Sequence, residues 1–208
     1  MQATKDSLDL DRNLQRSLAA GTLLGRVTYE TTGATKAKLA AGLRSIERQI
    51  PAGDFRPFSD VVRFHLRGEV LLAEGKSIPA LEEFKKADQL EAPTRDREYL
   101  ARGLLAAAQQ TNDATAASRM RDQALATYSA FALRPGLVWQ WAMENPPGYL
   151  SDETFSFAKA ASSYGRTDVR IETELSQYLG RRSLADAGLP EVEEAKRLVS
   201  LPMFRRSN

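Results

Sequence analysis

The sequence predicts an all-α protein, and three features of its pattern point to that class. Apolar residues recur every third or fourth position over nearly the whole chain, as in Leu10, Leu14 and Leu18, which is the spacing of one face of an amphipathic helix. Alternation with a period of two is hard to find over the length of a strand. Glycine, proline and polar pairs interrupt the periodic segments, so we expect short connections and antiparallel neighbouring helices.

The first two helices are expected over residues 6–30 and 34–50, with Gly33 between them. The stretch Val27-Thr28-Tyr29 is β-prone. It is too short for a convincing strand, and we interpret it as the fraying end of the first helix.

The next two helices are expected over 58–74 and 77–91, and the residues between them are typical of the end of one helix and the start of another. Gly75 is suited to end the first of them, and Ser77 to cap the second. Pro79 is tolerated in the first turn of that second helix because the amide there needs no intrahelical partner.

Five further helices complete the prediction. Their ranges are 95–110, 113–133, 151–164, 168–181 and 190–200. Asn112-Asp113 and Ser151 offer amino-terminal caps, and Pro190 stands where a first helical residue is expected. The one long irregular stretch is 134–150.

The segment 58–93 carries the best repeat unit, and its marker residues run from Phe64 to Pro93. Its marker residues are Phe64, Gly68, Leu71, Gly75, Ala80, Phe84, Ala87 and Pro93. This spacing resembles the tetratricopeptide repeat, in which small residues let two helices approach closely while larger side chains fill the spaces between them. Arg67 departs from the family's pattern, which places an apolar residue there.

The resemblance weakens along the chain. Tyr99 and Gly103 lie 35 residues after Phe64 and Gly68, and the range 95–133 keeps a degenerate second unit. Two more pairs retain only helical periodicity, and a short helix follows them. Their ranges are 6–50, 151–181 and 190–200.

The resemblance implies a right-handed α-α superhelix. We therefore expect one domain over 1–208, with about four helix pairs and a carboxy-terminal capping helix that covers the open end of the stack.

Composition excludes several classes of protein. The chain has no cysteine, so disulfides and thiol chemistry are absent. Its formal net charge is +2, too small to indicate a nucleic-acid partner. The amino terminus has no apolar signal core, and no apolar run is long enough to cross a membrane. We therefore expect a cytoplasmic protein, and we predict neither a nucleic-acid nor a membrane partner.

No motif predicts catalysis, a cofactor or a metal site. The Gly-Lys-Ser at 75–77 lacks the preceding glycine of a phosphate loop and joins two helices. The single histidine, His65, could act as a base with Glu69 one turn away, but we interpret the two as ordinary surface neighbours. Carboxylate pairs such as Glu82-Glu83 and Glu193-Glu194 are expected on exposed helix faces.

If the resemblance holds, the first helix of each pair lines a concave surface. The residues expected there are Val62, His65, Glu69, Leu72, Leu100 and Leu104, with Ala107 beside them. This set does not match the lysine, asparagine and arginine with which some members of the family hold a terminal carboxylate. It suits an apolar or helical segment better, unless a neighbouring helix of this chain already fills the groove.

Both tryptophans, Trp139 and Trp141, lie in 134–150. In a free loop they would form an interface patch. In a short helix they would project in different directions, so that one could plug a gap between helices while the other contacts a partner. Trp139 joins the list of candidate partner-binding residues.

The expected function is a non-catalytic scaffold that binds a protein or peptide segment, as a regulatory or assembly module. The alternative is a ligand- or peptide-sensing regulatory domain of a bacterial signalling protein. An enzyme with an unfamiliar site is the third possibility. The sequence does not determine the oligomeric state.

Overall fold

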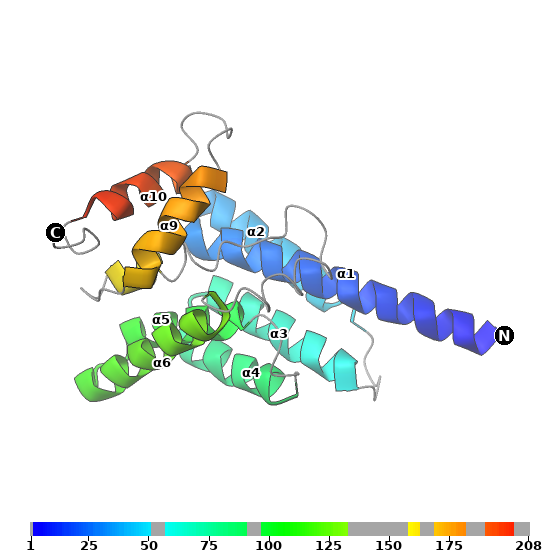
Figure 1. Ribbon diagram of the computed structural model, residues 1–208. Helices are drawn as coiled ribbons and strands as arrows, with labels where there is room; N and C mark the ends of the chain where they lie inside the picture. The colour runs from blue at the N-terminus through cyan, green and yellow to red at the C-terminus, as the bar shows by residue number, and fades with distance from the viewer. Residues whose placement is uncertain are drawn as a thin grey trace. The chain divides into compact units, whose positions relative to one another are not determined.

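A computed structural model describes residues 2–50, 57–90, 97–132, 158–162, 169–181 and 190–201, and all regular structure in these ranges is helical (Figure 1). The helices are α1 (Gln2–Glu30), α2 (Gly33–Glu47), α3 (Pro57–Ala73), α4 (Ser77–Leu90), α5 (Glu98–Gln110), α6 (Ala114–Ala132), α9 (Val169–Arg181) and α10 (Pro190–Ser200). Residues 158–162 are helical as well. The all-α prediction is confirmed, and most predicted helix ends lie within a few residues of the observed ones.

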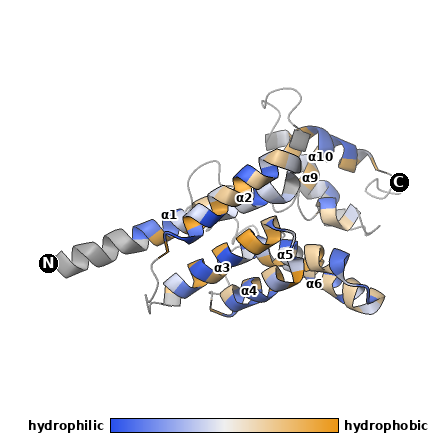
Figure 2. Ribbon diagram, turned by 180° about the vertical axis from the view of Figure 1, so that it is seen from behind, coloured by the Kyte–Doolittle hydropathy of each residue, from blue (hydrophilic) through white to orange (hydrophobic). Residues whose placement is uncertain are grey.

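The chain divides into two compact units, 1–124 and 125–208, with the boundary inside α6. Helices α1 to α5 belong to the first unit, and α9 and α10 pack against each other in the second. Figure 2 shows hydrophobic and hydrophilic residues interleaved along the helices, as amphipathic elements require.

Local sequence explains how several helices begin and end. Gly33 and Gly75 adopt positive φ angles of 66° and 78°, a conformation that glycine reaches without steric cost. Gly75 lies in the tight turn between α3 and α4. At the start of α6, the carboxylate of Asp113 accepts hydrogen bonds from the backbone N–H groups of Thr115 (2.9 Å) and Ala116 (3.0 Å), which confirms the predicted cap.

The expected cap at Ser77 is wrong by one position, because α4 already begins at Ser77. The side chain of Gln110, at the end of α5, holds the turn before α4. Its amide nitrogen donates to the carbonyl of Gly75 (2.6 Å), and its oxygen accepts from the backbone N–H of Ser77 (3.2 Å).

In the first unit, the hairpins α1–α2 and α3–α4 pack against each other, and α5 packs against the second of them. Helix α3 contacts α4 and both helices of the preceding hairpin, α1 and α2, while α5 contacts α3 and α4. A buried apolar cluster joins the first three helices. Its members are Leu14, Ile50, Val62 and Leu66, with Leu18, Ile46 and Phe58 packed against it.

Phe84 of α4 fills the space where α3, α4 and α5 meet. Its side chain is fully buried, as are Ala80 and Ala87 on the same helix. A methyl group on Gly68 of α3 would collide with the Phe84 ring, and one on Gly103 of α5 would lie 2.6 Å from it. The close approach that the repeat pattern predicted is therefore confirmed for this hairpin.

In the second unit, α9 and α10 each bury one face. Leu175 and Tyr178 of α9 are buried, as are Ala195 and Leu198 of α10. These residues follow the spacing of one face of an amphipathic helix.

Candidate functional site

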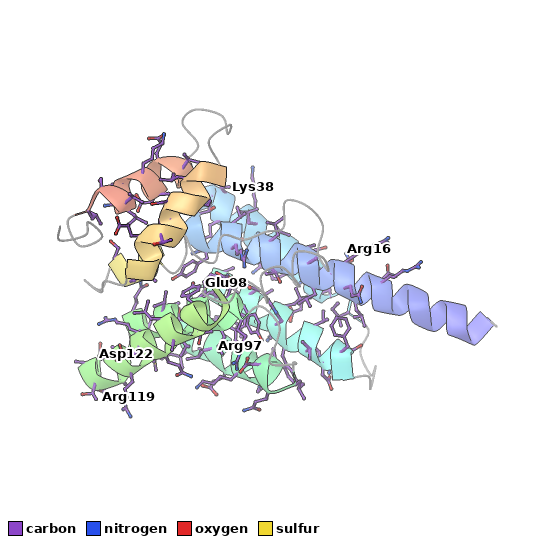
Figure 3. The ribbon with its side chains drawn as sticks, in the orientation of Figure 1. Arg16, Lys38, Arg97, Glu98, Arg119 and Asp122 are labelled. Atoms are coloured by element: carbon purple, nitrogen blue, oxygen red, sulfur yellow. The ribbon has the colours of Figure 1, made fainter. Side chains whose placement is uncertain are left out.

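A cluster of charged side chains lies where α1, α3 and α5 meet inside the first unit. We call Arg26, Glu69, Glu98 and Arg102 the charge network. Arg26 comes from α1, Glu69 from α3, and Glu98 and Arg102 from α5. Three of the four are almost wholly buried, and Arg26 keeps 19% of its side-chain surface exposed. Glu98 is labelled in Figure 3.

Arg102 is the centre of the charge network. Its Nη2 and Nη1 donate to Oε1 and Oε2 of Glu69 at 2.6 and 3.0 Å. Its Nε donates to both carboxylate oxygens of Glu98, at 2.9 and 3.0 Å. The guanidinium thus links α5 to α3, and it also bridges to Glu98 one turn away within α5.

Glu98 connects the network to α1. Oε2 of Glu98 accepts a hydrogen bond from Nε of Arg26 at 3.0 Å. On α1 as well, the Tyr29 ring lies 5.9 Å from the guanidinium carbon of Arg102, a distance at which a cation and an aromatic ring attract each other. Both contacts tie α1 to α5, although the two helices are far apart in sequence.

His65 extends the network toward α4. Its Nε2 lies 3.3 Å from Oε1 of Glu69, one turn further along α3, and 3.3 Å from Oγ1 of Thr22 on α1. The ring packs against Tyr99, with centroids 4.2 Å apart, and meets Phe84 edge-on at 6.0 Å. Polar contacts from α1 and α3 and aromatic contacts from α4 and α5 therefore hold the imidazole in place.

Electrostatics keep the two buried carboxylates ionised. Burial by itself raises the pKa of Glu69, but the charge of Arg102 and hydrogen bonds from His65 and Arg102 outweigh it, so that the pKa lies below its ordinary value. For Glu98, the charges of Arg102 and Arg26 outweigh burial and the repulsion from Glu69, so its pKa is lowered as well.

Local sequence makes the approach of α1 possible. A methyl group on Gly25 would collide with the Glu69 carboxylate, and one on Gly21 would collide with Leu66. The absence of side chains at these two positions brings α1 close enough for Thr22 and Arg26 to reach the network.

Within the network, the two carboxylates face two guanidiniums. Buried ion pairs of this kind cost free energy to desolvate, and their clearest effect is to favour one packing over others. Within the described ranges, no group of three or more His, Cys, Asp or Glu residues is arranged to hold a metal ion.

Six of the seven residues that the sequence singled out for partner binding are buried. They are Val62, His65, Glu69, Leu72, Leu100 and Leu104; the seventh, Trp139, lies outside the described residues, as does Trp141. The structure brings two of the six together, His65 and Glu69. Partner contact through these side chains stays a prediction, and it would require them to become exposed.

The interpretation of His65 and Glu69 as surface neighbours is wrong. They are neighbours, but only 3% and 1% of their surfaces are exposed. The reason is tertiary: α1 packs on this face of α3, and Arg102 supplies the countercharge that lets Glu69 be buried.

Sequence reasoning missed Arg26, Glu98 and Arg102. One signal was present for Arg102, because it is the only charged residue in the run from Tyr99 to Ala108. A charge in the middle of an otherwise apolar helix needs a buried partner of opposite sign. Nothing in the sequence shows that Glu69, which is 33 positions away, is that partner.

The predictions for the turn at 75–77 and for the exposed position of Glu82 are confirmed. Residues 75–77 form the turn between α3 and α4 and the first residue of α4. Glu82 and Glu83 accept hydrogen bonds from Lys85 and Lys86 on the surface of α4. Arg67, the departure from the repeat pattern, is exposed and pairs with Glu47 of α2 at 3.2 Å.

Comparisons with known proteins found no match for this chain among family models, curated proteins or solved structures. None of the described helices combines the length and the apolar character that crossing a membrane requires.

Proposed function

We propose that this chain is a non-catalytic helical-repeat scaffold that binds a protein or peptide segment, as a regulatory or assembly module. The observation that carries the proposal is the packing order in the first unit. Helix α3 contacts both helices of the hairpin before it, α1 and α2, and α5 contacts both helices of the α3–α4 hairpin. Stacked helix pairs of this kind build the extended surfaces that repeat proteins use for binding.

The contacts of Phe84 support a tetratricopeptide-like arrangement within that stack. The ring lies between Gly68 on the first helix of its own pair and Gly103 on the helix that follows the pair, α5. One aromatic side chain thus links α5 to the preceding pair through two glycines, as the sequence pattern implies. We propose in addition that the stacked helices form a right-handed superhelix.

The charge network supports a structural rather than a substrate-binding role for the interior of the stack. Its carboxylates and guanidiniums engage one another across α1, α3 and α5. A buried network whose members satisfy each other fixes how three helices pack. We therefore assign partner binding to the outer face of the stack.

We assign the docking face to α1. Leu23 and Val27 are one turn apart on the same side of this helix, and each is about half exposed, at 50% and 47%. Arg16 lies on the same side by helical spacing, and it projects into solvent (Figure 3). In the part of the chain that the structure describes, the other large exposed apolar residues are Ile78 and Leu90, which lie twelve positions apart on α4 and do not share a face.

The occupant that fits this face is an amphipathic helical segment with an acidic residue. Its apolar side would cover Leu23 and Val27, and its carboxylate would pair with Arg16. The apolar contacts with Leu23 and Val27 would supply the affinity. The peripheral charge pair with Arg16 would mainly set the orientation of the segment and its rate of association.

The test compares two variants that carry equal changes. Leu23→Asp/Val27→Asp alters the proposed face, and Ile78→Asp/Leu90→Asp alters exposed apolar residues of α4. All four positions are about half exposed, so both variants should keep the helical circular dichroism of the wild type. Proteins retained by each immobilised chain from a lysate of the cell of origin are then compared, and a helical segment of any retained protein is titrated as a peptide.

We expect the wild type and the α4 variant to retain a protein that the α1 variant does not retain. The peptide from that protein should likewise bind the wild type and the α4 variant more tightly than the α1 variant. Equal retention by all three chains, or equal loss from both variants, would contradict the assignment to α1. A peptide that binds only when it carries no acidic residue would contradict the proposed partner chemistry.

A further inference from the structure

The α1–α2 hairpin is much more basic than the rest of the chain. Seven basic and two acidic residues lie between positions 12 and 48, a net charge of +5 in a chain whose formal net charge is +2. The remainder of the sequence is therefore slightly acidic. A concentration of positive charge on one pair of helices attracts partners of negative charge and repels positive ones.

Ion pairs within the first unit use only part of this charge. Arg26 belongs to the charge network, and Arg44 pairs with Glu74, just after α3. Among the side chains that the structure describes on α1 and α2, Glu47 is the only carboxylate, and Arg67 of α3 pairs with it. The described carboxylate of the hairpin is thus already engaged by a neighbouring helix.

Three exposed basic side chains of the hairpin make no ion pair within the described ranges. They are Arg16 on α1, Lys38 on α2 and Arg48, just after α2. Figure 3 shows Arg16 and Lys38 projecting into solvent. Their charges are available to the carboxylates of a partner.

The hairpin places Lys38 level with the exposed apolar residues of α1. Only residues 31–32 connect α1 to α2, so positions equally distant from this turn lie at the same level along the two helices. Lys38 therefore lies level with the stretch between Leu23 and Val27. The apolar residues near the far end of the hairpin agree with this register, since one cluster contains Leu14, Leu18, Ile46 and Ile50.

One helical ligand can contact both helices of the hairpin. The axes of packed helices lie about 8–10 Å apart, so a segment that covers Leu23 and Val27 is within reach of a lysine on α2. Arg16 lies about nine positions along α1 from the level of Lys38, which is about 14 Å at the helical rise. A segment of three to four turns would span the distance between the two charges.

We propose that the docking face of α1 continues onto α2 through Lys38 and selects an acidic amphipathic helix. One carboxylate of the ligand lies opposite Lys38, beside the apolar contacts with Leu23 and Val27, and a second lies about nine positions away, opposite Arg16. A basic helix of the same shape is rejected because it would bring like charges together. The inference rests on the docking face proposed for α1.

A second copy of the chain fits this surface less well than an acidic helix. Two copies that met through the same face would bring the basic residues of both hairpins together. An anionic lipid surface shares the negative charge of the ligand, and the test therefore includes it.

The test measures binding of three synthetic helical peptides to the full chain by fluorescence anisotropy. Each peptide has the same stripe of leucines, and two flanking positions about nine residues apart carry glutamate, glutamine or lysine. Each titration is made at about 0.05 M and about 0.5 M NaCl, because screening weakens exposed charge pairs at high salt. Vesicles of phosphatidylcholine and phosphatidylserine are the lipid probe.

Two variants with the same change in net charge show whether the position of the charges matters. Arg16→Glu/Lys38→Glu reverses two charges of the proposed surface, and Lys85→Glu/Lys196→Glu reverses two exposed lysines of other helices. All four positions are exposed, so both variants should keep the helical circular dichroism of the wild type.

We expect the glutamate peptide to bind the wild type and the control variant several-fold more tightly than the glutamine peptide does. This preference should shrink at high salt and disappear in Arg16→Glu/Lys38→Glu, which should bind the lysine peptide several-fold more tightly than the wild type does. Equal binding of the three peptides, equal effects of the two variants, or no binding of the glutamate peptide overturns the proposal. Retention of the chain on vesicles without binding of that peptide overturns it as well.

Leu23→Asp/Val27→Asp distinguishes failure of this inference from failure of the docking face. If that variant loses all three peptides while the wild type binds them equally, α1 remains the docking face and the selection by charge is wrong. If it binds every peptide as the wild type does, the docking face itself is wrong, and the inference falls with it.

Discussion

Arg102 on α5 holds Glu69 on α3 through both terminal nitrogens of its guanidinium, at 2.6 and 3.0 Å, and both side chains are almost wholly buried. The pair is therefore sheltered from the solvent screening that makes most surface ion pairs weak. Its partners lie 33 positions apart in the sequence, so the contact constrains how two successive helix pairs stack.

Removing one partner of this pair should be costly. We expect Arg102→Met to lower the free energy of unfolding by about 3–5 kcal/mol, because it leaves the buried carboxylates of Glu69 and Glu98 without their main countercharge. Urea unfolding at pH 7 measures the change. Lys85→Met, which breaks the exposed pair with Glu82, is the control and should cost less than about 1 kcal/mol.

The double variant Glu69→Met/Arg102→Met separates pairing from simple loss of contacts. If the two charges stabilise each other, the double variant should be less destabilised than the sum of the two single variants. Additive losses would show that the buried pair is energetically uncoupled.

Acid should weaken the first unit. The pKa values of Glu69 and Glu98 lie below the ordinary value of 4.5 in the folded chain. Their contribution to stability is therefore present above about pH 4.5 and is lost as the pH falls through the folded-state values. We expect the urea midpoint to fall steeply below pH 4.5. In Glu69→Met/Arg102→Met the fall should be shallower, and an equal slope in both proteins would contradict the assignment.

Two glycines should respond to alanine in opposite directions. In Gly68→Ala the new methyl group meets the Phe84 ring, and we expect a loss of about 1–3 kcal/mol. In Gly42→Ala, inside α2, the new methyl group meets no atom within 4 Å, and we expect a gain of about 0.5–1 kcal/mol from helix propensity. Thermal and urea unfolding measure both, and a shared sign would contradict the packing described for α3 and α4.

Two phenylalanines offer a matched comparison of core and surface. Phe84→Ala removes a fully buried ring between two glycines and should cost about 3–5 kcal/mol. Phe64→Ala removes a half-buried ring that Arg63 and Lys86 flank at 5.9 and 5.5 Å. It should cost clearly less, since part of that ring already faces water. Similar losses would mean that the aromatic of α3 is as important to the core as that of α4.

The sequence predicted the helices well because their signals are local. The apolar spacing of Leu14 and Leu18 follows from the period of the helix, and the turn at Gly75 follows from a positive φ angle that glycine adopts freely. The Phe84–Gly68 contact was also predictable, since the repeat pattern places a large residue on one helix opposite a small one on its partner.

The candidate site was predicted less well because burial depends on what covers a face. The spacing of His65 and Glu69 on α3, and of Leu104 on α5, predicted that they lie on the concave faces of first helices, where a partner would bind. The structure buries all three residues, so we expect Leu104→Glu to unfold the stack by burying a charge. Periodicity identifies a face of a helix but not its neighbour.

The sequence by itself determined that the chain is helical, where most helices begin and end, and that Gly68 allows α3 and α4 to approach closely at Phe84. Only the tertiary structure decided that α1 lies on α3, and that Arg26, Glu69, Glu98 and Arg102 meet in one buried network. The physical reason is the sequence separation over which each interaction acts. Helix periodicity and turn conformation are set within a few residues, whereas a buried charge is tolerated only where distant segments bring it a countercharge.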